Sequence, residues 1–470
     1  MRFLRLYLGT ALLVCSGLAV AATFNVNSIT DAHDATPGDG VCATAALTCT
    51  LRAAFEEANA LAGPDTVNVP AGTYTPSSTA AAGMYVAAFS ITDSVSIVGA
   101  SPAGTIIDGS SVIGSLTATT HCIGGMVTNG NCNIGPVIVT ISALTLRNGQ
   151  GSAPSGGAIC NDADLTVENT WFTNNASTQY NAGIGGAVYN SSAGRLTINN
   201  SLFDGNTSFQ GGAIETQGDT TISASTFHGN QSLSNGVLYG GGGAVDFAAG
   251  SFGKILASTF YQNSARRGGA IAVNSSAGPV EIVNSTISAN ASSEAGGAVY
   301  VSTGLAIVNV RSSTITLNRA NDCTCGYQGG GIAAPNGGYS ILLQNSILAQ
   351  NSYTVTTAPV RILQPDECLG NVFSISALLT SHVDTGYCTV SGTHISNDAP
   401  GLAPLQDNGG PTKTHALLTG SPAIGASASN TCTDGTSQLT SDERGFSRPL
   451  APVCDIGAFE ELVFRGNFGP

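Results

Sequence analysis

A sevenfold repeat between Gly156 and Asn351 restricts the chain to one kind of architecture. The copies share a Gly-Gly-Ala-(Ile/Val) motif, a run of the form (Ile/Val/Leu)-x-x-(Ser/Thr), an apolar residue two positions later and an asparagine five positions later. The hydroxyl residues are Thr170, Ser201, Ser225, Ser258, Ser285, Ser313 and Ser346, and the asparagines are Asn175, Asn206, Asn230, Asn263, Asn290, Asn318 and Asn351. Their five-residue offset never varies, whereas the period varies between 24 and 33 residues. A period of this size indicates a solenoid in which the loops absorb the differences in length.

Apolar and polar residues alternate within the copies, for example over 196–199 and 280–283. Alternation with a period of two predicts β-strands, and no helical spacing continues for ten residues in the repeats. We therefore expect an all-β fold, a right-handed parallel β-helix, in which equivalent residues of successive coils stack about 4.8 Å apart. The expected columns are an asparagine ladder at one turn and an apolar interior stack of Phe172, Phe203, Phe227, Phe260, Ile287, Ile315 and Leu348.

The amino-acid composition limits the classes of partner that this solenoid can bind. Glycine provides 60 of 470 residues, and charged residues are only 9% of the chain, with a net charge of −14. This balance disfavours a nucleic-acid partner or an anionic membrane surface. No cofactor motif occurs, and the six histidines are too scattered to form a zinc site with the cysteines, so we expect neither a cofactor nor a metal.

The first 21 residues have the pattern of a secretory signal peptide: arginines at positions 2 and 5, an apolar stretch, and Ala19-Val20-Ala21. We expect the mature chain to be extracellular or at the cell surface, without a transmembrane helix. Eleven cysteines then remain, and close pairs fit an oxidising compartment. The expected disulfides are Cys42–Cys49, Cys122–Cys132, Cys323–Cys325, Cys368–Cys388 and Cys432–Cys454, which leaves Cys160 without an assigned partner.

Residues 51–62 form the one amphipathic helical pattern, and we expect this helix to cap the first coil. The chain then divides into a signal peptide (1–21), an N-terminal cap with the first strands (22–75), a parallel β-helix (76–400) and a C-terminal region (401–470) expected to cap the last coil.

Three resemblances to known families accompany this division. Cys49-Thr50-Leu51-Arg52-Ala53-Ala54 resembles the Cys-Ser-Leu-Arg-Glu-Ala module of bacterial exported β-helix proteins. The Gly-Gly-Ala-Ile and Phe-x-x-Asn elements resemble the repeats of polymorphic outer-membrane proteins. Blocks such as 442–445 and 454–460 are similar to the choice-of-anchor Q region. These resemblances imply export, a place at the cell surface or outer membrane, and adhesion.

The column that follows Gly-Gly-Ala-(Ile/Val) holds the candidate chemistry: Cys160, Tyr189, Glu215, Asp246, Ala272 and Tyr300. Period-two alternation predicts that this column faces outward, which would place Glu215 and Asp246 about 5 Å apart, as in a retaining glycosidase. Tyr189 and Tyr300 would flank a shallow sugar-binding strip. The alternative is a solvated polar ladder with a tolerated contact between like charges.

Three long loops, 176–184, 231–241 and 319–329, are expected to leave one corner of the solenoid. Each carries a tyrosine, Tyr180, Tyr239 or Tyr327, so this corner is a second candidate binding edge; the alternative is that insertions are simply tolerated there. We also expect Arg266 to pair with Glu294 across one coil. Two functions remain open: a non-catalytic exported protein that presents a binding face to a polysaccharide or a cell-surface protein, or a polysaccharide-active lyase or glycoside hydrolase.

Overall fold

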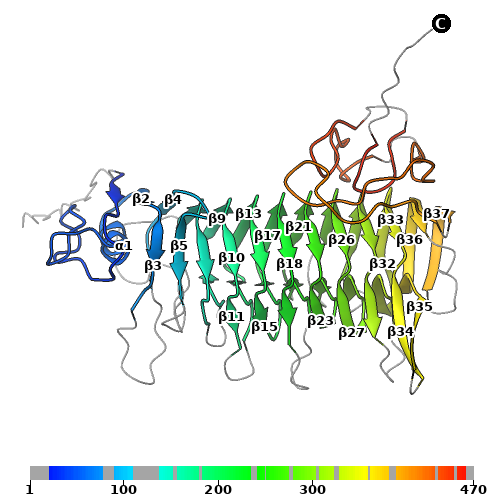
Figure 1. The fold of residues 1–470 in the computed structure, drawn as a ribbon, viewed down its shortest axis with the longest axis horizontal. Coiled ribbons are helices and arrows are strands. Elements are labelled where there is room, and N and C mark those ends of the chain that lie inside the picture. The colour runs from blue at the N-terminus through cyan, green and yellow to red at the C-terminus, as the bar shows by residue number, and fades with distance from the viewer. Residues whose placement is uncertain are drawn as a thin grey trace, which may run out of the picture.

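The computed structural model describes residues 21–77, 89–109, 137–151, 156–178, 183–233, 241–248, 250–274, 279–302, 306–321, 328–357, 360–379, 388–397, 399–428, 432–448 and 453–461. Within them the chain winds into a parallel β-solenoid, and α1 (Leu51–Ala60) is the one helix. Figure 1 shows the coils following one another along the long axis, from α1 at one end to β37 at the other. The predicted parallel β-helix fold is confirmed.

Each regular coil contributes strands to four faces, which we number in the order the chain visits them. The first face contains β1 (Thr23–Asn25), β2 (Asp65–Val69), β4 (Val95–Gly99), β6 (Ile138–Ser142), β9 (Asp164–Glu168), β13 (Arg195–Asn199), β17 (Asp219–Ser223), β21 (Gly253–Leu256), β25 (Val280–Val283), β29 (Val308–Arg311), β32 (Ile332–Gln344), β36 (Cys368–Leu379) and β37 (Cys388–Ser396). The second face contains β3 (Gly72–Tyr74), β5 (Thr105–Asp108), β7 (Thr145–Arg147), β10 (Trp171–Thr173), β14 (Leu202–Asp204), β18 (Thr226–His228), β22 (Thr259–Tyr261), β26 (Thr286–Ser288), β30 (Thr314–Thr316) and β33 (Ile347–Ala349).

The third and fourth faces complete the coil. The third face is a separate sheet of β11 (Ala176–Ser177), β15 (Thr207–Ser208), β19 (Gln231–Ser232), β23 (Ser264–Arg267), β27 (Ala291–Ala295), β31 (Arg319–Asn321), β34 (Ser352–Thr357) and β35 (Val360–Pro365). The fourth face contains β8 (Ile159–Asn161), β12 (Val188–Asn190), β16 (Ile214–Thr216), β20 (Val245–Phe247), β24 (Ile271–Val273) and β28 (Val299–Val301), and continues into the start of β32. Among the described strands only β34 and β35 pair antiparallel.

The predicted apolar column lies in the core. Its seven members pair in register from coil to coil, and each is fully buried. The four phenylalanine rings stack nearly parallel, with centroids 4.5–4.6 Å apart. The residue just before a buried asparagine or serine of the repeat commonly has a positive φ, as at Asn174 and Asn200, because the chain bends sharply there between two faces.

The asparagine ladder is continuous over all seven copies. Each side-chain amide donates to the side-chain oxygen of the next asparagine at 2.9–3.0 Å, and that oxygen also accepts the preceding asparagine's backbone N–H. The last amide, on Asn351, donates to the Glu367 carboxylate at 2.6 Å. A buried carboxylate therefore terminates a row of aligned N–H dipoles, so every donor of the row is satisfied.

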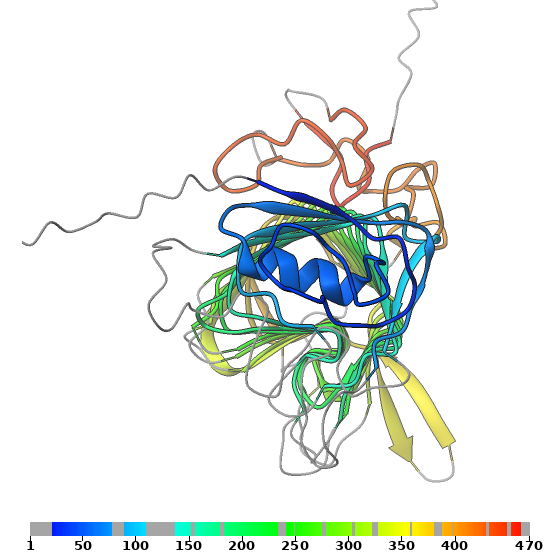
Figure 2. The same ribbon diagram turned by 90° about the vertical axis from the view of Figure 1, so that its left-hand side faces the viewer.

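The two ends of the solenoid are covered differently. At the N-terminal end α1 lies across the first coils (Figure 2) and buries Leu51, Ala54, Phe55 and Ala58. Thr50 caps this helix, because its side-chain oxygen accepts the Ala53 backbone N–H at 3.1 Å. The expected N-terminal capping helix is thus present, although it ends at Ala60.

The C-terminal module, which we define as the described residues 399–461, does not cover the last coil. Figure 1 shows its orange-to-red chain above the C-terminal half of the solenoid. Its contacts are with the sides of several coils: Glu443 accepts hydrogen bonds from Thr259 and Thr286, and Ala458 N–H donates to Thr314. We expected this region to cap the last coil; its described motif-rich blocks hydrogen-bond to hydroxyls on the second face.

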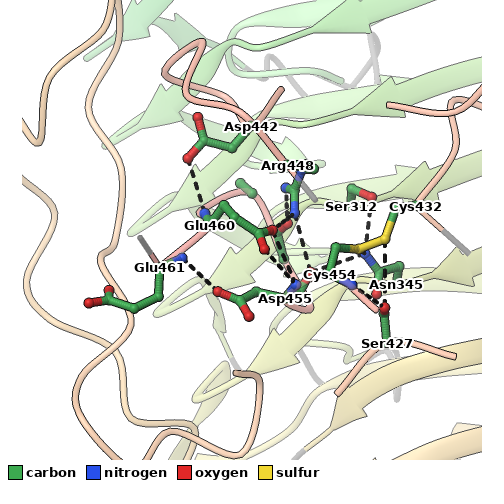
Figure 3. A network of polar contacts seen from close by, with 12 residues as sticks. Ser312, Asn345, Ser427, Cys432, Asp442, Arg448, Cys454, Asp455, Glu460 and Glu461 are labelled. Atoms are coloured by element: carbon green, nitrogen blue, oxygen red, sulfur yellow. Dashed lines mark hydrogen bonds and ion pairs between the residues drawn. A yellow bond between two sulfur atoms is a disulfide. The ribbon is translucent and has the colours of Figure 1, made fainter. Parts of the chain in front are cut away.

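A buried ionic network anchors the module (Figure 3). The Arg448 guanidinium is fully buried and lies 2.7 Å from the Glu460 carboxylate. It also donates to the Asn284 side chain on the solenoid and to the Gly457 carbonyl. Figure 3 shows Arg448 and Glu460 pointing toward one another beside the Cys432–Cys454 disulfide. Arg448 therefore connects the module to the coils through Asn284, while Glu460 balances its charge within the module.

Candidate functional site: a lateral groove on the first face

The predicted carboxyl pair lies on adjacent strands of the fourth face. Glu215 on β16 is in register with Asp246 on β20, with Tyr189 and Ala272 as their outer neighbours. The residues that precede the column point into the main core, whereas Tyr300 belongs to a separate buried cluster with Ala333. The column thus faces away from the core, as alternation predicts.

Apart from Tyr189, which is half-buried, the column is nevertheless covered, which contradicts the expected exposed strip. Glu215 is 3% exposed and Asp246 is fully buried. The chain just before each Gly-Gly corner forms an extra layer, in which Gly241 pairs with Arg267. A Cβ atom on Gly241 would stand 3.0 Å from Asp246 Oδ2, so a larger residue would fit here only if the Asp246 carboxyl group shifted slightly. Sequence alternation alone could not reveal this second layer.

Burial controls the protonation of the pair. Removal from water raises the pKa of Glu215 well above its usual value, and the charge of Asp246 raises it further. Burial also raises the pKa of Asp246, to about 7, although a 2.6 Å hydrogen bond from Asn274 acts in the opposite direction. The pair therefore retains a proton near neutral pH, and its covered position keeps a polymer out of reach of either carboxyl group.

The other predicted positions have varied outcomes. Tyr300 is 6% exposed and lies under the Arg267 guanidinium, whose carbon is 5.3 Å from the ring centroid. Arg266 pairs with Glu294 as expected, and Arg267 joins the same carboxylate. Tyr180, Tyr239 and Tyr327 lie outside the described residues.

Three of the expected disulfides are present: Cys42–Cys49, Cys368–Cys388 and Cys432–Cys454. Cys160 is also disulfide-bonded. The remaining expected pairs, Cys122–Cys132 and Cys323–Cys325, lie outside the described residues. Within the described ranges no group of three or more His, Cys, Asp and Glu side chains has a metal-binding arrangement. The same ranges hold no helix with the length and apolar content of a membrane span.

A groove of about 440 Å³ on the first face is the site that sequence reasoning missed. It runs across the beginnings of β13, β17 and β21, and its main side chains are Arg195, Thr197, Asp219, Thr221, Phe252 and Lys254. These side chains face outward because the residues next to them in the sequence, such as Leu196 and Ile222, point into the core. The lateral groove, as we call it, is thus built on rigid coils.

Phe252 is the unusual member of the lateral groove. Its carbonyl accepts the Thr220 N–H at 2.9 Å, which fixes the backbone, while the residue is 54% exposed. Exposure of a large aromatic residue at a fixed position among polar side chains is typical of a recognition surface. In the sequence Phe252 is one apolar residue ahead of a strand, and no pattern distinguishes it from a core residue.

Charges of both signs surround the lateral groove. Arg195 lies 3.9 Å from Asp164, and Lys254 lies 3.6 Å from Asp434 of the C-terminal module. Burial raises the pKa of Asp434, but hydrogen bonds from Ser437 and Thr436 and the charge of Lys254 lower it by more, so its pKa lies below the usual range. The module therefore supplies a fixed negative charge to one edge of the groove, and the net charge of its surroundings is small.

Comparison with known proteins adds little to this geometry. No family model matches the chain, and no curated protein matches it. A solved structure titled "Rhamnogalacturonan lyase" is similar over 85% of this chain and 96% of its own, with 13% identity and a TM-score of 0.37. The A-module of mannuronan C-5 epimerase AlgE6 from Azotobacter vinelandii is similar over 82% of this chain and 100% of its own, with 16% identity and a TM-score of 0.27. At these TM-scores neither structure informs the function of this chain.

Proposed function

We propose that the chain is an exported surface or extracellular protein that binds a neutral polysaccharide in the lateral groove and does not cleave it. The observation that carries this proposal is the exposed ring of Phe252 between Arg195, Asp219 and Lys254. A sugar ring offers an apolar face and several equatorial hydroxyls. An aromatic ring can stack on the apolar face, while charged side chains and threonine hydroxyls form hydrogen bonds with the equatorial hydroxyls of the sugar.

The regular coils support a polymer as the ligand. Thr197 and Thr221 are in register on adjacent strands, and coils about 4.8 Å apart repeat the same hydroxyl along the solenoid. This spacing is close to the length of one pyranose unit, so a chain laid along the axis meets equivalent groups at each residue. The mixed charge of Arg195, Lys254, Asp219 and Asp434 favours an uncharged polymer over a polyanion.

The positions of the carboxyl groups support binding without cleavage. A glycoside hydrolase needs two carboxyl groups on either side of the scissile bond. Among the residues that line the lateral groove, Asp219 is the one acid, whereas Glu215 and Asp246 lie buried on the fourth face. The signal-like N-terminus, the disulfides and the resemblance to exported surface proteins support a location outside the cell.

Calorimetric titration of the purified chain with neutral and acidic polysaccharides tests the proposal. We expect a neutral polymer to bind, and Phe252→Ala to weaken that binding about three- to tenfold, which corresponds to a stacking contact of about 1 kcal/mol. Ile307→Ala is the matched control, because Ile307 is 48% exposed just before β29 but does not line the groove. Equal affinity of Phe252→Ala and wild type for every polymer would refute the site.

The same polymers also test the alternative that the chain is an enzyme that cleaves polysaccharides. Incubation followed by an assay for new reducing ends or unsaturated products should give none with wild type. If products appear and Glu215→Gln together with Asp246→Asn abolishes them, the buried pair is catalytic and the non-catalytic proposal is wrong.

A further inference from the structure

The two ends of the long sheet are protected to different degrees. At the N-terminal end the edge strand β1 is three residues long, and α1 lies beside it. Short strands and covering helices are common ways to keep a sheet edge from pairing with other chains. The N-terminal end is therefore closed to strand addition.

At the C-terminal end the edge strand β37 lacks these protections. It is nine residues long, Cys388–Ser396, and among the described strands it pairs only with β36. Of its nine residues only Cys388 is buried. It contains no proline and no charged residue, and the 12 residues of β36 beside it contain none either. Proline and charge are the other means by which natural edges avoid pairing.

Charge and apolar exposure favour contact at this end. Two copies of a chain with a net charge of −14 repel each other over most of their surfaces. The strands β36 and β37 themselves carry no charged residue, and Phe373 on β36 is 41% exposed. A contact along these two strands thus brings no charged side chains of the strands together.

We propose that two copies of the chain associate end to end through β37. A head-to-tail arrangement is excluded by the closed N-terminal end, so the contact is two-fold and β37 pairs antiparallel with β37 of the second copy. With Ser391 at the two-fold axis, Thr389 stands opposite Thr393 of the other copy, and the two side chains lie on the same face of the joined sheet. The first faces of the two solenoids then form one continuous sheet, with a lateral groove on each half.

Light scattering of the purified full chain after size-exclusion chromatography tests the proposal. The expected mass is twice that of the monomer, with dissociation on dilution. Thr389 and Thr393 are exposed, so replacing both by glutamate should leave the fold intact and place two opposed pairs of carboxylates at the contact. We expect this double-glutamate variant to be monomeric, because like charges opposed in a ladder destabilise it.

A charge-swapped partner separates loss of the contact from loss of the fold. The variant carrying Thr389→Lys and Thr393→Lys should also be monomeric alone, and mixing it one to one with the double-glutamate variant should restore a heterodimer. Thr73→Glu, at an exposed position near the N-terminal end, should leave the wild-type dimer unchanged. A monomeric wild type, for example because another segment or another protein covers β37, would overturn the proposal. So would a double-glutamate variant that remains dimeric.

Discussion

The solenoid coils and the C-terminal module solve the problem of burying polar groups in opposite ways. The coils repeat uncharged ladders, in which each asparagine and each serine bonds to its counterpart one coil away. The module buries ionisable groups that occur once, such as Arg448, Glu460 and Glu443. A repeated neutral ladder spreads its stabilising contacts along the axis, whereas a single buried ion pair depends on both partners.

The largest expected effect comes from removing one ring of the interior phenylalanine stack. Phe227→Ala should destabilise the solenoid by about 3–5 kcal/mol, because its fully buried ring contacts Phe203 and Phe260 at 4.5–4.6 Å and leaves a cavity. Chemical denaturation followed by circular dichroism measures the loss. Trp171→Ala, at a partly exposed position of the second face, is the control and should cost much less. Equal losses for both variants would show that the phenylalanine stack contributes nothing particular.

The next effect breaks the ionic network of the module. Arg448→Met should destabilise the module by about 3–4 kcal/mol, because Glu460 then remains buried without its partner. Hydrogen exchange should rise over 399–461 and stay unchanged over the N-terminal coils. The double variant Arg448→Met, Glu460→Leu should recover much of this loss. Arg195→Met, which removes an exposed pair, should cost less than about 1 kcal/mol.

The comparison also predicts that the stability of the module, and not that of the uncharged ladders, depends on pH. Burial raises the pKa of Glu443 to about 8, and hydrogen bonds from Thr286, Thr259 and Thr412 only partly offset this rise. The folded carboxyl group holds its proton more tightly than the unfolded one, whose pKa is 4.5. Its contribution is therefore complete below pH 4.5 and declines as the pH rises toward 8, by on the order of 3 kcal/mol.

Glu443→Gln isolates this titration. We expect the melting temperature of wild type to fall between pH 5 and pH 8, and the fall to be smaller in Glu443→Gln. Glu460, with a pKa raised to about 7 by burial, contributes in the same direction. Identical pH profiles for wild type and Glu443→Gln would mean that Glu443 is ionised in the folded protein.

The smallest expected effect concerns one rung of the asparagine ladder. Asn263→Ala should destabilise the solenoid by about 2 kcal/mol, because the Asn230 backbone N–H and side-chain amide both lose their acceptor. Asn68→Ala removes an exposed side-chain hydrogen bond to Asn25 and serves as the control in the same denaturation assay. If the two variants unfold at the same denaturant concentration, neighbouring rungs or water replace the lost bonds.

The sequence by itself determined the repeated part of this protein. Phe172, Asn175 and Thr170 recur at fixed offsets in later copies, and only a parallel stack places equivalent residues in columns. The same alternation predicted that Glu215 and Asp246 are neighbours that point away from the core. These features depend on contacts between equivalent positions one coil apart, which a period in the sequence records directly.

Only the tertiary structure decided what covers those columns and where the exposed surfaces lie. The layer before the Gly-Gly corners buries Glu215 and Asp246, and the module packs along the second face rather than over the last coil. The lateral groove combines Arg195, Asp219 and Lys254 from three coils with an edge from Asp434, more than 150 residues away in the chain. Such contacts join residues that differ in type and occur once. No repeat records them, because they depend on how the loops and the module fold back on the coils.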